Sequence, residues 1–330
     1  MALPFTVLNR VLKPFRNLLA SRPVLATCQV NLKCNSACGY CDLPLNVGRY
    51  EMTRKEIHVV FSHLYREGVR FVLVQGGEPL LRRDVPEILE ELSAIGFHLT
   101  LITNGTKITP QLVERLSQLQ VAISVSLDTL DRAKYRIIRG ADQLAQVLEG
   151  IALLSDFTQP KFLTCIVSEV NRVEVPAVVR FAQEQGFLPV VGAYHWNVGI
   201  YGRPEELLMY DRSSAAVFSG LLDDELIPPG YLRKFVEDNV SWLRGQKLEP
   251  CDAGRYSIAI DASGNVSPCL AFPPVGNLLE STLGEILVRF DRAAIKICSD
   301  NSSCNRLDGR VVGTNLRHPI TALRTARSFP

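Results

Sequence analysis

The feature that most constrains the fold is a regular alternation of strand-like and helix-like segments between residue 24 and about residue 196. Short runs rich in β-branched and aromatic residues are separated by stretches whose apolar positions recur with helical spacing. Strands joined by helices favour right-handed crossovers, so this α/β pattern predicts a parallel sheet, either doubly wound or closed into part of a barrel. The predicted strands are 24–32, 71–75, 99–103, 122–127, 162–167 and 189–194, and the predicted helices lie near 53–67, 82–95, 109–118, 141–155 and 173–185.

Local signals mark the ends of several of these helices. Thr53 and Thr109 suit N-cap positions, and Thr109 is followed by Pro110 at the first helical position. Gly96 and Gly186 stand just beyond helix ends, where a left-handed C-terminal cap prefers glycine.

The pattern changes after about residue 200. Residues 204–245 are predicted to be helical with Pro and Gly interruptions, residues 256–269 to form a hairpin around the turn 261–265, and residues 282–293 to hold a short helix. We therefore expect four parts: an N-terminal amphipathic segment (1–23), the α/β barrel (24–200), a smaller hairpin-plus-helix module (201–305) and a C-terminal tail (306–330).

Composition excludes several classes of protein. The 330 residues are 47% hydrophobic and 21% charged, which excludes bulk disorder, and a net charge of +2 gives no general case for nucleic-acid binding. No apolar run reaches the roughly 18 residues of a membrane span. Nine cysteines without a recognisable secretion signal favour thiolate or metal chemistry in a reducing compartment, the cytoplasm.

Three of these cysteines crowd into one loop directly after the first predicted strand. Cys34, Cys38 and Cys41 fall within eight residues, so their thiols can face one point. A structural zinc site usually takes four ligands in two separated pairs, which this loop does not supply. Three thiolates on a cubane [4Fe–4S] cluster would leave one iron without a protein ligand and open to a cofactor.

This spacing, with the aromatic Tyr40 before the last cysteine, resembles the signature of the radical S-adenosylmethionine (SAM) superfamily. The resemblance implies a partial (β/α)6 barrel of TIM type, a [4Fe–4S] cluster on the three cysteines and SAM bound at its open iron. The Gly76-Gly77-Glu78 turn follows the second strand, where that family contacts the SAM amino group.

Further polar residues follow the third and fourth predicted strands. The resemblance implies that they contact the SAM ribose and carboxylate, and the strand ends of αβ barrels are where such sites are built. Taken singly, each is also an ordinary strand-end residue. Their occurrence in order, each at the carboxyl end of a strand, is what favours a SAM site. They are Asn104, Ser126 and Asp128, with Arg136 and Arg139 as partners for the carboxylate.

A second cysteine set lies in the C-terminal module. Cys251 and Cys269 flank the predicted hairpin, and Cys298 and Cys304 follow in a polar loop. Spacing alone leaves zinc and an iron–sulfur cluster open. The module resembles the SPASM and twitch extensions of radical SAM enzymes, which implies an auxiliary [4Fe–4S] cluster. A full SPASM module has seven cysteines, so four favour a twitch-like module with one cluster, in which Cys298 is the weakest ligand.

Other segments carry open alternatives. Tyr194 and His195, with Trp196 and Asn197, either act on substrate as acid, base or donor, or cap the barrel opening. Cys28 and Cys165 lie within predicted strands and favour packing. Residues 3–19 carry an apolar stripe interrupted by Pro14, which favours packing under the barrel over contact with a membrane surface. The tail carries five arginines, which either attract an anionic substrate or partner or are simply solvated, and we expect a solvated tail.

The resemblance implies a radical SAM enzyme that needs a flavodoxin- or ferredoxin-type reductant and acts on a small molecule, lipid or peptide. The chain length is similar to that of the molybdenum-cofactor cyclase of the superfamily, but its C-terminal cysteine pattern and terminal Gly-Gly are absent here. An iron–sulfur electron carrier or scaffold and a zinc-stabilised binding protein remain as alternatives.

Overall fold

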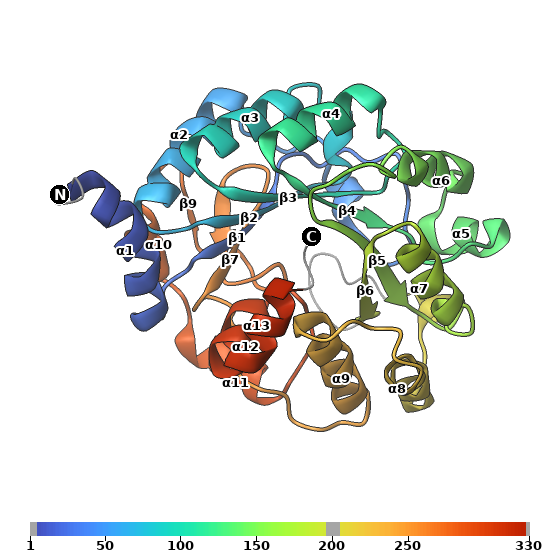
Figure 1. Ribbon diagram of the computed structural model, residues 1–330. Helices are drawn as coiled ribbons and strands as arrows, with labels where there is room; N and C mark the ends of the chain where they lie inside the picture. Colours follow the sequence, from blue (N-terminus) through green and yellow to red (C-terminus); the bar gives the residue numbers. More distant parts are fainter. Residues whose placement is uncertain (1–4, 196–204, 328–330) are drawn as a thin grey trace.

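The computed structural model describes residues 5–195 and 205–327, and it contains an open barrel-like sheet wrapped by helices (Figure 1). Neighbouring strands follow the order β6-β5-β4-β3-β2-β1, and every adjacent pair among them is parallel. The expected partial α/β barrel is confirmed. The strands are β1 (Leu25–Gln29), β2 (Phe71–Gln75), β3 (His98–Thr103), β4 (Ala122–Ser126), β5 (Lys161–Val167) and β6 (Leu188–Ala193).

The helices that alternate with these strands cover the outer face of the sheet (Figure 1). Their apolar stripes face the sheet, and the buried side chains of helices and strands form one core that also contains Cys28 and Cys165. The packing role expected for those two thiols is thereby supported. The helices are α2 (Arg54–Arg66), α3 (Val85–Ile95), α4 (Pro110–Leu119), α5 (Arg132–Arg139), α6 (Leu144–Ala152) and α7 (Val175–Glu184).

The expected caps are present. Thr53 begins α2 in a capping box with Glu56, and the Thr109 side chain accepts a hydrogen bond from the Leu112 amide at the start of α4. Gly96 ends α3 in the left-handed conformation. Helix α5 was absent from the sequence prediction, because its short and strongly polar sequence carries little apolar signal.

The predicted hairpin is confirmed, but it does not stand apart from the barrel. Strand β7 (Ser257–Ile260) pairs in parallel with β1, and β8 (Asn265–Ser267) and β9 (Gly276–Asn277) continue antiparallel from it. The sheet therefore extends beyond β1 to nine strands. The hairpin therefore shares its sheet with the barrel through the pairing of β7 with β1, and the expected domain boundaries stay a prediction.

The C-terminal region is helical and folded onto the barrel. Helices α12 and α13 pack beside α9 (Figure 1). Helix α11 extends into the expected loop at 298–304, and α12 and α13 replace the expected solvated tail, so both expectations are corrected. The helices are α8 (Ala215–Asp223), α9 (Tyr231–Leu243), α10 (Leu283–Leu287), α11 (Arg292–Asp300), α12 (Val311–Arg317) and α13 (Pro319–Arg327).

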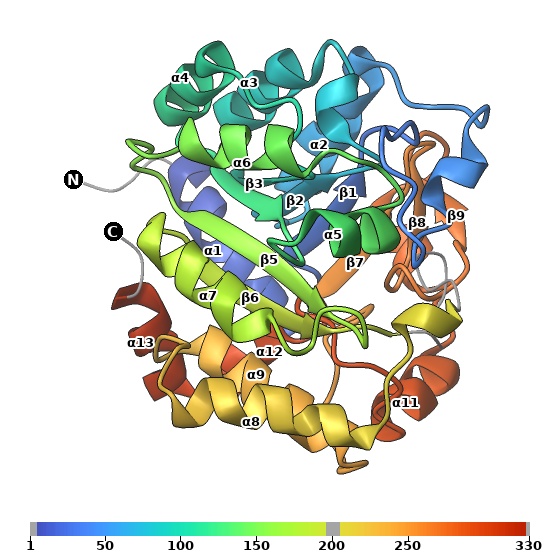
Figure 2. The same cartoon turned by 90° about the vertical axis from the view of Figure 1, so that its right-hand side faces the viewer.

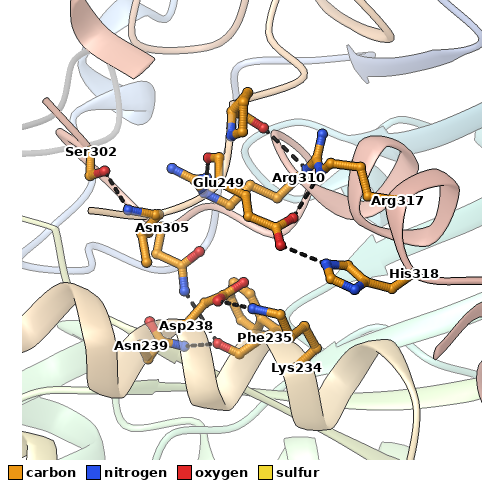
Figure 3. A network of polar contacts seen from close by, with 12 residues as sticks. Lys234, Phe235, Asp238, Asn239, Glu249, Ser302, Asn305, Arg310, Arg317 and His318 are labelled. Carbon is orange, nitrogen blue, oxygen red and sulfur yellow. Dashed lines mark hydrogen bonds and ion pairs between the residues drawn. The ribbon is translucent and has the colours of Figure 1, made fainter. Parts of the chain in front are cut away.

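A polar network fastens this region (Figure 3). The Glu249 carboxylate accepts from Nε of Arg317 at 2.8 Å and lies 2.5 Å from Nε2 of His318. Arg310 is 3% exposed and donates to the carbonyls of Glu249 and Cys304. Two arginines of the expected solvated tail are thus bound to the body of the protein.

Helix α1 (Phe5–Leu19) continues through Pro14. The Asn17 side-chain amide donates to the carbonyls of Pro23 and Glu67, which ties the helix to the barrel. The Phe15 and Leu19 side chains are exposed. The side chains of residues 5–11 are outside the described part, so the packing expected for the stripe stays a prediction. Short 3-10 turns complete the fold at Leu43–Asn46, Pro79–Leu81, Glu206–Leu208 and Arg212–Ser214.

Among the helices that the structure describes, none has the length and apolar character that crossing a membrane requires.

Candidate functional site

A cavity of about 520 Å³ occupies the inside of the barrel, and we call it the barrel cavity. It is open to the carboxyl ends of the strands, where sites of αβ barrels are built. Many of the residues that the sequence singled out share its wall. These are Cys34, Cys38, Tyr40, Cys41, Gly76, Gly77, Asn104, Ser126, Arg139 and His195.

The Gly76-Gly77 turn lies directly against the segment that leads into the cysteine loop. A Cβ on Gly76 would stand 2.6 Å from the Asn31 carbonyl oxygen, and one on Gly77 would stand 2.4 Å from the Lys33 carbonyl oxygen. The Gly77 amide donates to the Asn31 carbonyl at 3.0 Å. Glycine is needed here because two backbones meet, and this closeness places the turn at the cavity wall.

Helix α5 supports the cysteine loop from the other side. The Ala37 amide donates to the Arg139 carbonyl at 3.0 Å, and the Gly39 amide donates to the Ile138 carbonyl at 3.1 Å. Gly140 ends the helix at φ +63°, with the position of a Cβ only 2.1 Å from the Ala37 carbonyl oxygen. The helix that the sequence analysis missed therefore positions the thiols, and the Asp131 cap with Gly140 was the signal that could have found it.

Asn104 joins the end of β3 to the same loop. Its side-chain nitrogen Nδ2 donates to the Asn35 side-chain oxygen at 2.8 Å, and its side-chain oxygen accepts from the Thr106 backbone amide at 3.0 Å. These bonds orient Asn104 toward the loop while it lines the barrel cavity. Contact of Asn104 with SAM stays a prediction.

Glu78 is placed differently from Gly76 and Gly77. Its carboxylate accepts hydrogen bonds from the Thr103 hydroxyl and the Asn104 amide, both at 2.7 Å, and from the Leu80 amide at 3.1 Å. The side chain is fully buried, which raises the carboxyl pKa, and it is not among the described residues that line the cavity. In this structure the Glu78 carboxylate joins the turn after β2 to the end of β3, and its contact with the SAM amino group stays a prediction.

Asp128 and Arg139 form a buried ion pair at the end of β4, with 2.7 Å between Oδ2 and Nε. Asp128 is fully buried and also accepts from the Ile166 amide, whereas Arg139 reaches the cavity and lies 5.7 Å from the Tyr40 ring centre. Asp128 is thus placed to orient Arg139 rather than to touch a ligand. Arg136 is exposed.

The donor set of the triplet fits a cluster with an open iron. Cys34, Cys38 and Cys41 line one cavity, and burial raises the thiol pKa of Cys34 and raises that of Cys41 to about 12. Iron would therefore displace protons from these thiols on binding. In the described residues no three Cys, His, Asp or Glu side chains stand close enough to hold a single metal ion. A four-iron core spaces its thiolates more widely than one ion does.

Three cysteines of the second set come together. Burial raises the thiol pKa of Cys269 and of Cys304 to about 12, and the Cys251 thiol contributes to both shifts through its charge. Cys251 follows Glu249, Cys269 follows β8 and Cys304 follows α11, so three distant segments supply them. Cys298 lies on α11 instead of in the expected loop.

Arg306 links this second set to the barrel cavity. It lines the cavity, lies 3.3 Å from the Asp308 carboxylate, and neighbours the thiols of Cys269 and Cys304. Asp308 in turn accepts from the Thr27 hydroxyl of β1 at 3.3 Å. The sequence analysis placed Arg306 in a solvated tail because nothing local marks a segment that folds back over the barrel.

The two weak catalytic candidates are held by protein groups. The Tyr194 hydroxyl accepts from the Glu205 amide at 3.1 Å, and Nε2 of His195 accepts from the Asn305 amide at 3.0 Å. Burial, with the nearby Arg306 and Arg310, lowers the His195 pKa to about 3. A neutral His195 with its acceptor nitrogen occupied fits a capping role better than acid–base work. Trp196 and Asn197 lie outside the described residues.

Comparison with known proteins identifies both halves of the site. Residues 29–182 match the model of the radical SAM superfamily, and residues 251–306 match the iron–sulfur cluster-binding SPASM domain. These two domains carry [4Fe–4S] clusters and SAM as their cofactors.

Curated relatives agree with this pair of domains. The chain is 36% identical over 155 residues to a probable GTP 3',8-cyclase of Pyrococcus horikoshii, which covers 46% of this chain and 50% of that protein. It is 32% identical over 258 residues to the GTP 3',8-cyclase of Sinorhizobium medicae, which covers 76% of this chain and 68% of that one. The chain thus spans about half the length of the first relative and two thirds of the second.

A solved structure shares the fold. Streptococcus suis SuiB bound to the precursor peptide SuiA superimposes with a TM-score of 0.69 at 18% identity, covering 91% of this chain and 73% of that one. Because the barrel, the cysteine triplet and the matched domains coincide along the chain, this protein belongs to the radical SAM superfamily and carries a SPASM-type iron–sulfur domain.

Proposed function

We propose that this protein cleaves SAM reductively at a [4Fe–4S] cluster held by Cys34, Cys38 and Cys41, and abstracts a hydrogen atom from a substrate in the barrel cavity. The observation that carries the proposal is that these thiols share one cavity with Gly77, Asn104, Ser126 and Arg139. When bound and reduced, the cluster supplies one electron to SAM, which yields methionine and a 5'-deoxyadenosyl radical.

The protein's own residues hold and orient the reactants. The Gly76-Gly77 turn lets backbone approach the methionine end of SAM, and Arg139 presents a guanidinium whose orientation is set by Asp128. The barrel wall excludes water from a reactive radical. A flavodoxin- or ferredoxin-type protein in a reducing cytoplasm would supply the electron.

Cys251, Cys269 and Cys304, with Cys298 as the least supported member, would hold an auxiliary [4Fe–4S] cluster beside the cavity. When bound, that cluster can accept one electron from a substrate radical and so make the net reaction an oxidation or a crosslink. Arg306 lines the cavity and keeps a positive charge beside these thiols.

GTP cyclisation is a second candidate, favoured by the relatives named GTP 3',8-cyclase. It requires binding sites for a triphosphate. The cationic side chains among the described lining residues are Arg139 and Arg306, and each is paired with a carboxylate. This charge balance makes GTP the weaker candidate.

Anaerobic reconstitution tests the main proposal. The reduced protein should form 5'-deoxyadenosine and methionine from SAM, and the Cys38→Ala variant should form neither. A colourless protein that binds zinc would instead support a zinc-stabilised binding protein. A brown protein that neither binds nor cleaves SAM would support an electron carrier. Adding GTP and searching for a cyclised product tests the second candidate.

A further inference from the structure

Below its charged rim, the inside of the barrel is lined mostly by apolar side chains from β2, β3, β5 and β6. The hydroxyls of Thr27, Thr100, Ser124 and Thr164 lie among them, and those of Ser124 and Thr164 hydrogen-bond each other at 2.8 Å. In closed αβ barrels such inward side chains fill the interior. Here they line open space instead. We call this part of the barrel cavity the shaft, and it is lined by Leu73, Ile102, Phe162, Ile166, Leu188 and Val190.

The shaft runs along the strands. Phe162 stands near the start of β5 and Ile166 near its end, so a rise of about 3.3 Å per residue gives roughly 13 Å between them. At the amino ends of the strands the cavity is lined by Pro228, Pro229 and Thr325, which we call the floor. Figure 2 agrees, since α13, which carries Thr325, lies at the end where β5 and β6 begin, and α5 lies at the end where their arrowheads point.

The floor is built by specific contacts. The Thr325 hydroxyl accepts from the Tyr231 amide at 2.8 Å, and Gly230 has φ +124° with its Cβ position 2.8 Å from the Thr325 nitrogen. Helix α13 is thus held against the start of α9 at this end of the barrel.

Charge is confined to the rim and is balanced there. Arg139 pairs with Asp128 at the cysteine end, and Arg306 pairs with Asp308 beside the second cysteine set. In the described lining, the shaft itself has no charged side chain. Transfer of an apolar group from water into such a cavity is favourable, whereas a polyanion would lose its hydration there without gaining polar partners.

We infer that the substrate carries an extended apolar chain, of acyl or isoprenoid type, which lies in the shaft with its polar end toward the cysteines. This inference rests on the proposed function, because it names the substrate class for the same cavity. An extended chain matches a space that follows β5 from Phe162 to Ile166, and the charged rim places the chain's functionalised end beside SAM.

The test is chain-length dependence of binding to the reconstituted full-length protein with SAM present. Octanoate, dodecanoate and hexadecanoate compete, below their micelle concentrations, against a fluorescent fatty acid. Affinity should rise by up to about fourfold per added methylene and then level off once the shaft is filled. The inference would be overturned if octanoate and dodecanoate bind with equal affinity. It would also be overturned if GTP displaces the probe and none of the carboxylates does.

Variants of shaft residues in the first half of β6 make the test specific. Leu188→Trp and the milder Val190→Phe should weaken dodecanoate binding at least tenfold and leave octanoate binding unchanged. Val173→Trp is the matched control, because Val173 is 84% exposed outside the barrel. Equal weakening of both carboxylates in folded variants would count against the shaft.

SAM cleavage is measured in parallel, so the two ideas can fail separately. Formation of 5'-deoxyadenosine without any chain-length preference removes the apolar substrate and leaves the proposed function standing. Chain-length preference without SAM cleavage under reducing conditions supports the shaft as a binding site and removes the radical reaction.

Discussion

The carboxylate of Asp128 lies 2.7 Å from Nε of Arg139, and neither side chain has more than 7% of its surface exposed. Although burial lowers the Arg139 pKa, the Asp128 charge raises it well above the usual value, so the guanidinium is charged. The pair stands where β4 meets the end of α5, beside the Tyr40 ring. It connects the sheet, the cysteine loop and the cavity wall at one point.

Replacing Asp128 with Asn should therefore be costly. Removal of one partner leaves the Arg139 charge buried and unpaired, and we expect unfolding free energy to fall by about 3–5 kcal/mol in urea titrations. SAM affinity should fall as well, because Arg139 loses its orientation. The control is Asp142→Asn, which breaks an exposed pair with Arg132 and should change the unfolding free energy far less, because solvent screens the pair. Equal costs for the two variants would contradict this role.

Glu78→Gln tests whether the turn acts on SAM directly or through the fold. Loss of the charged acceptor for Thr103 and Asn104 should cost about 1.5–3 kcal/mol of stability and slow SAM cleavage about ten- to a hundredfold. Thr103→Val removes one of those bonds while keeping the carboxylate. If Thr103→Val reproduces part of the kinetic loss, the effect runs through the fold. Unchanged cleavage in Glu78→Gln would make the turn purely structural.

The two cysteine groups should differ in what they support. Cys34→Ala, Cys38→Ala or Cys41→Ala should abolish SAM cleavage, because alanine leaves an iron without its ligand. Cys251→Ala and Cys269→Ala should retain some 5'-deoxyadenosine formation and lose product turnover. Circular dichroism must accompany each assay, since cluster ligands also stabilise small modules. Parent-rate turnover in folded variants of the second group would show that its site is only structural.

Iron analysis tests the second group independently. Two cubane clusters predict about eight irons per chain after anaerobic reconstitution. Cys269→Ala should lower the count to about four. Cys298→Ala should leave it near eight if Cys251, Cys269 and Cys304 suffice as protein ligands. A count near four in the parent protein would remove the auxiliary cluster.

His195 predicts a pH dependence of stability. Its pKa is lowered to about 3 in the folded protein by burial and by Arg306 and Arg310, against about 6.5 when unfolded. Between these values the unfolded chain binds the additional proton, so stability should fall as pH drops below about 6.5, by up to about 1.4 kcal/mol per pH unit. His195→Gln keeps an acceptor for the Asn305 amide and should flatten this slope between pH 5 and 6.5. An unchanged slope in urea titrations would show that other groups dominate.

Much of this structure could be predicted from signals that lie within a short stretch of the chain. Helix α2 with its Thr53 capping box, the left-handed Gly96 and the hairpin after Cys251 each depend on neighbours a few residues away. The cysteine triplet is equally local, because one loop carries all three thiols. Such features are set by backbone preference and side-chain reach, so they can be read from the sequence alone.

Only the tertiary structure decided the features that join distant segments. Pairing of β7 with β1, the bonds from Glu78 to the end of β3 and the position of Arg306 in the cavity wall each join residues far apart in the chain. No local pattern specifies them, because the free energy that selects them comes from burying whole surfaces together and satisfying their polar groups. The chain itself determined which residues could bind iron and SAM, and packing determined that an apolar shaft lies beneath them.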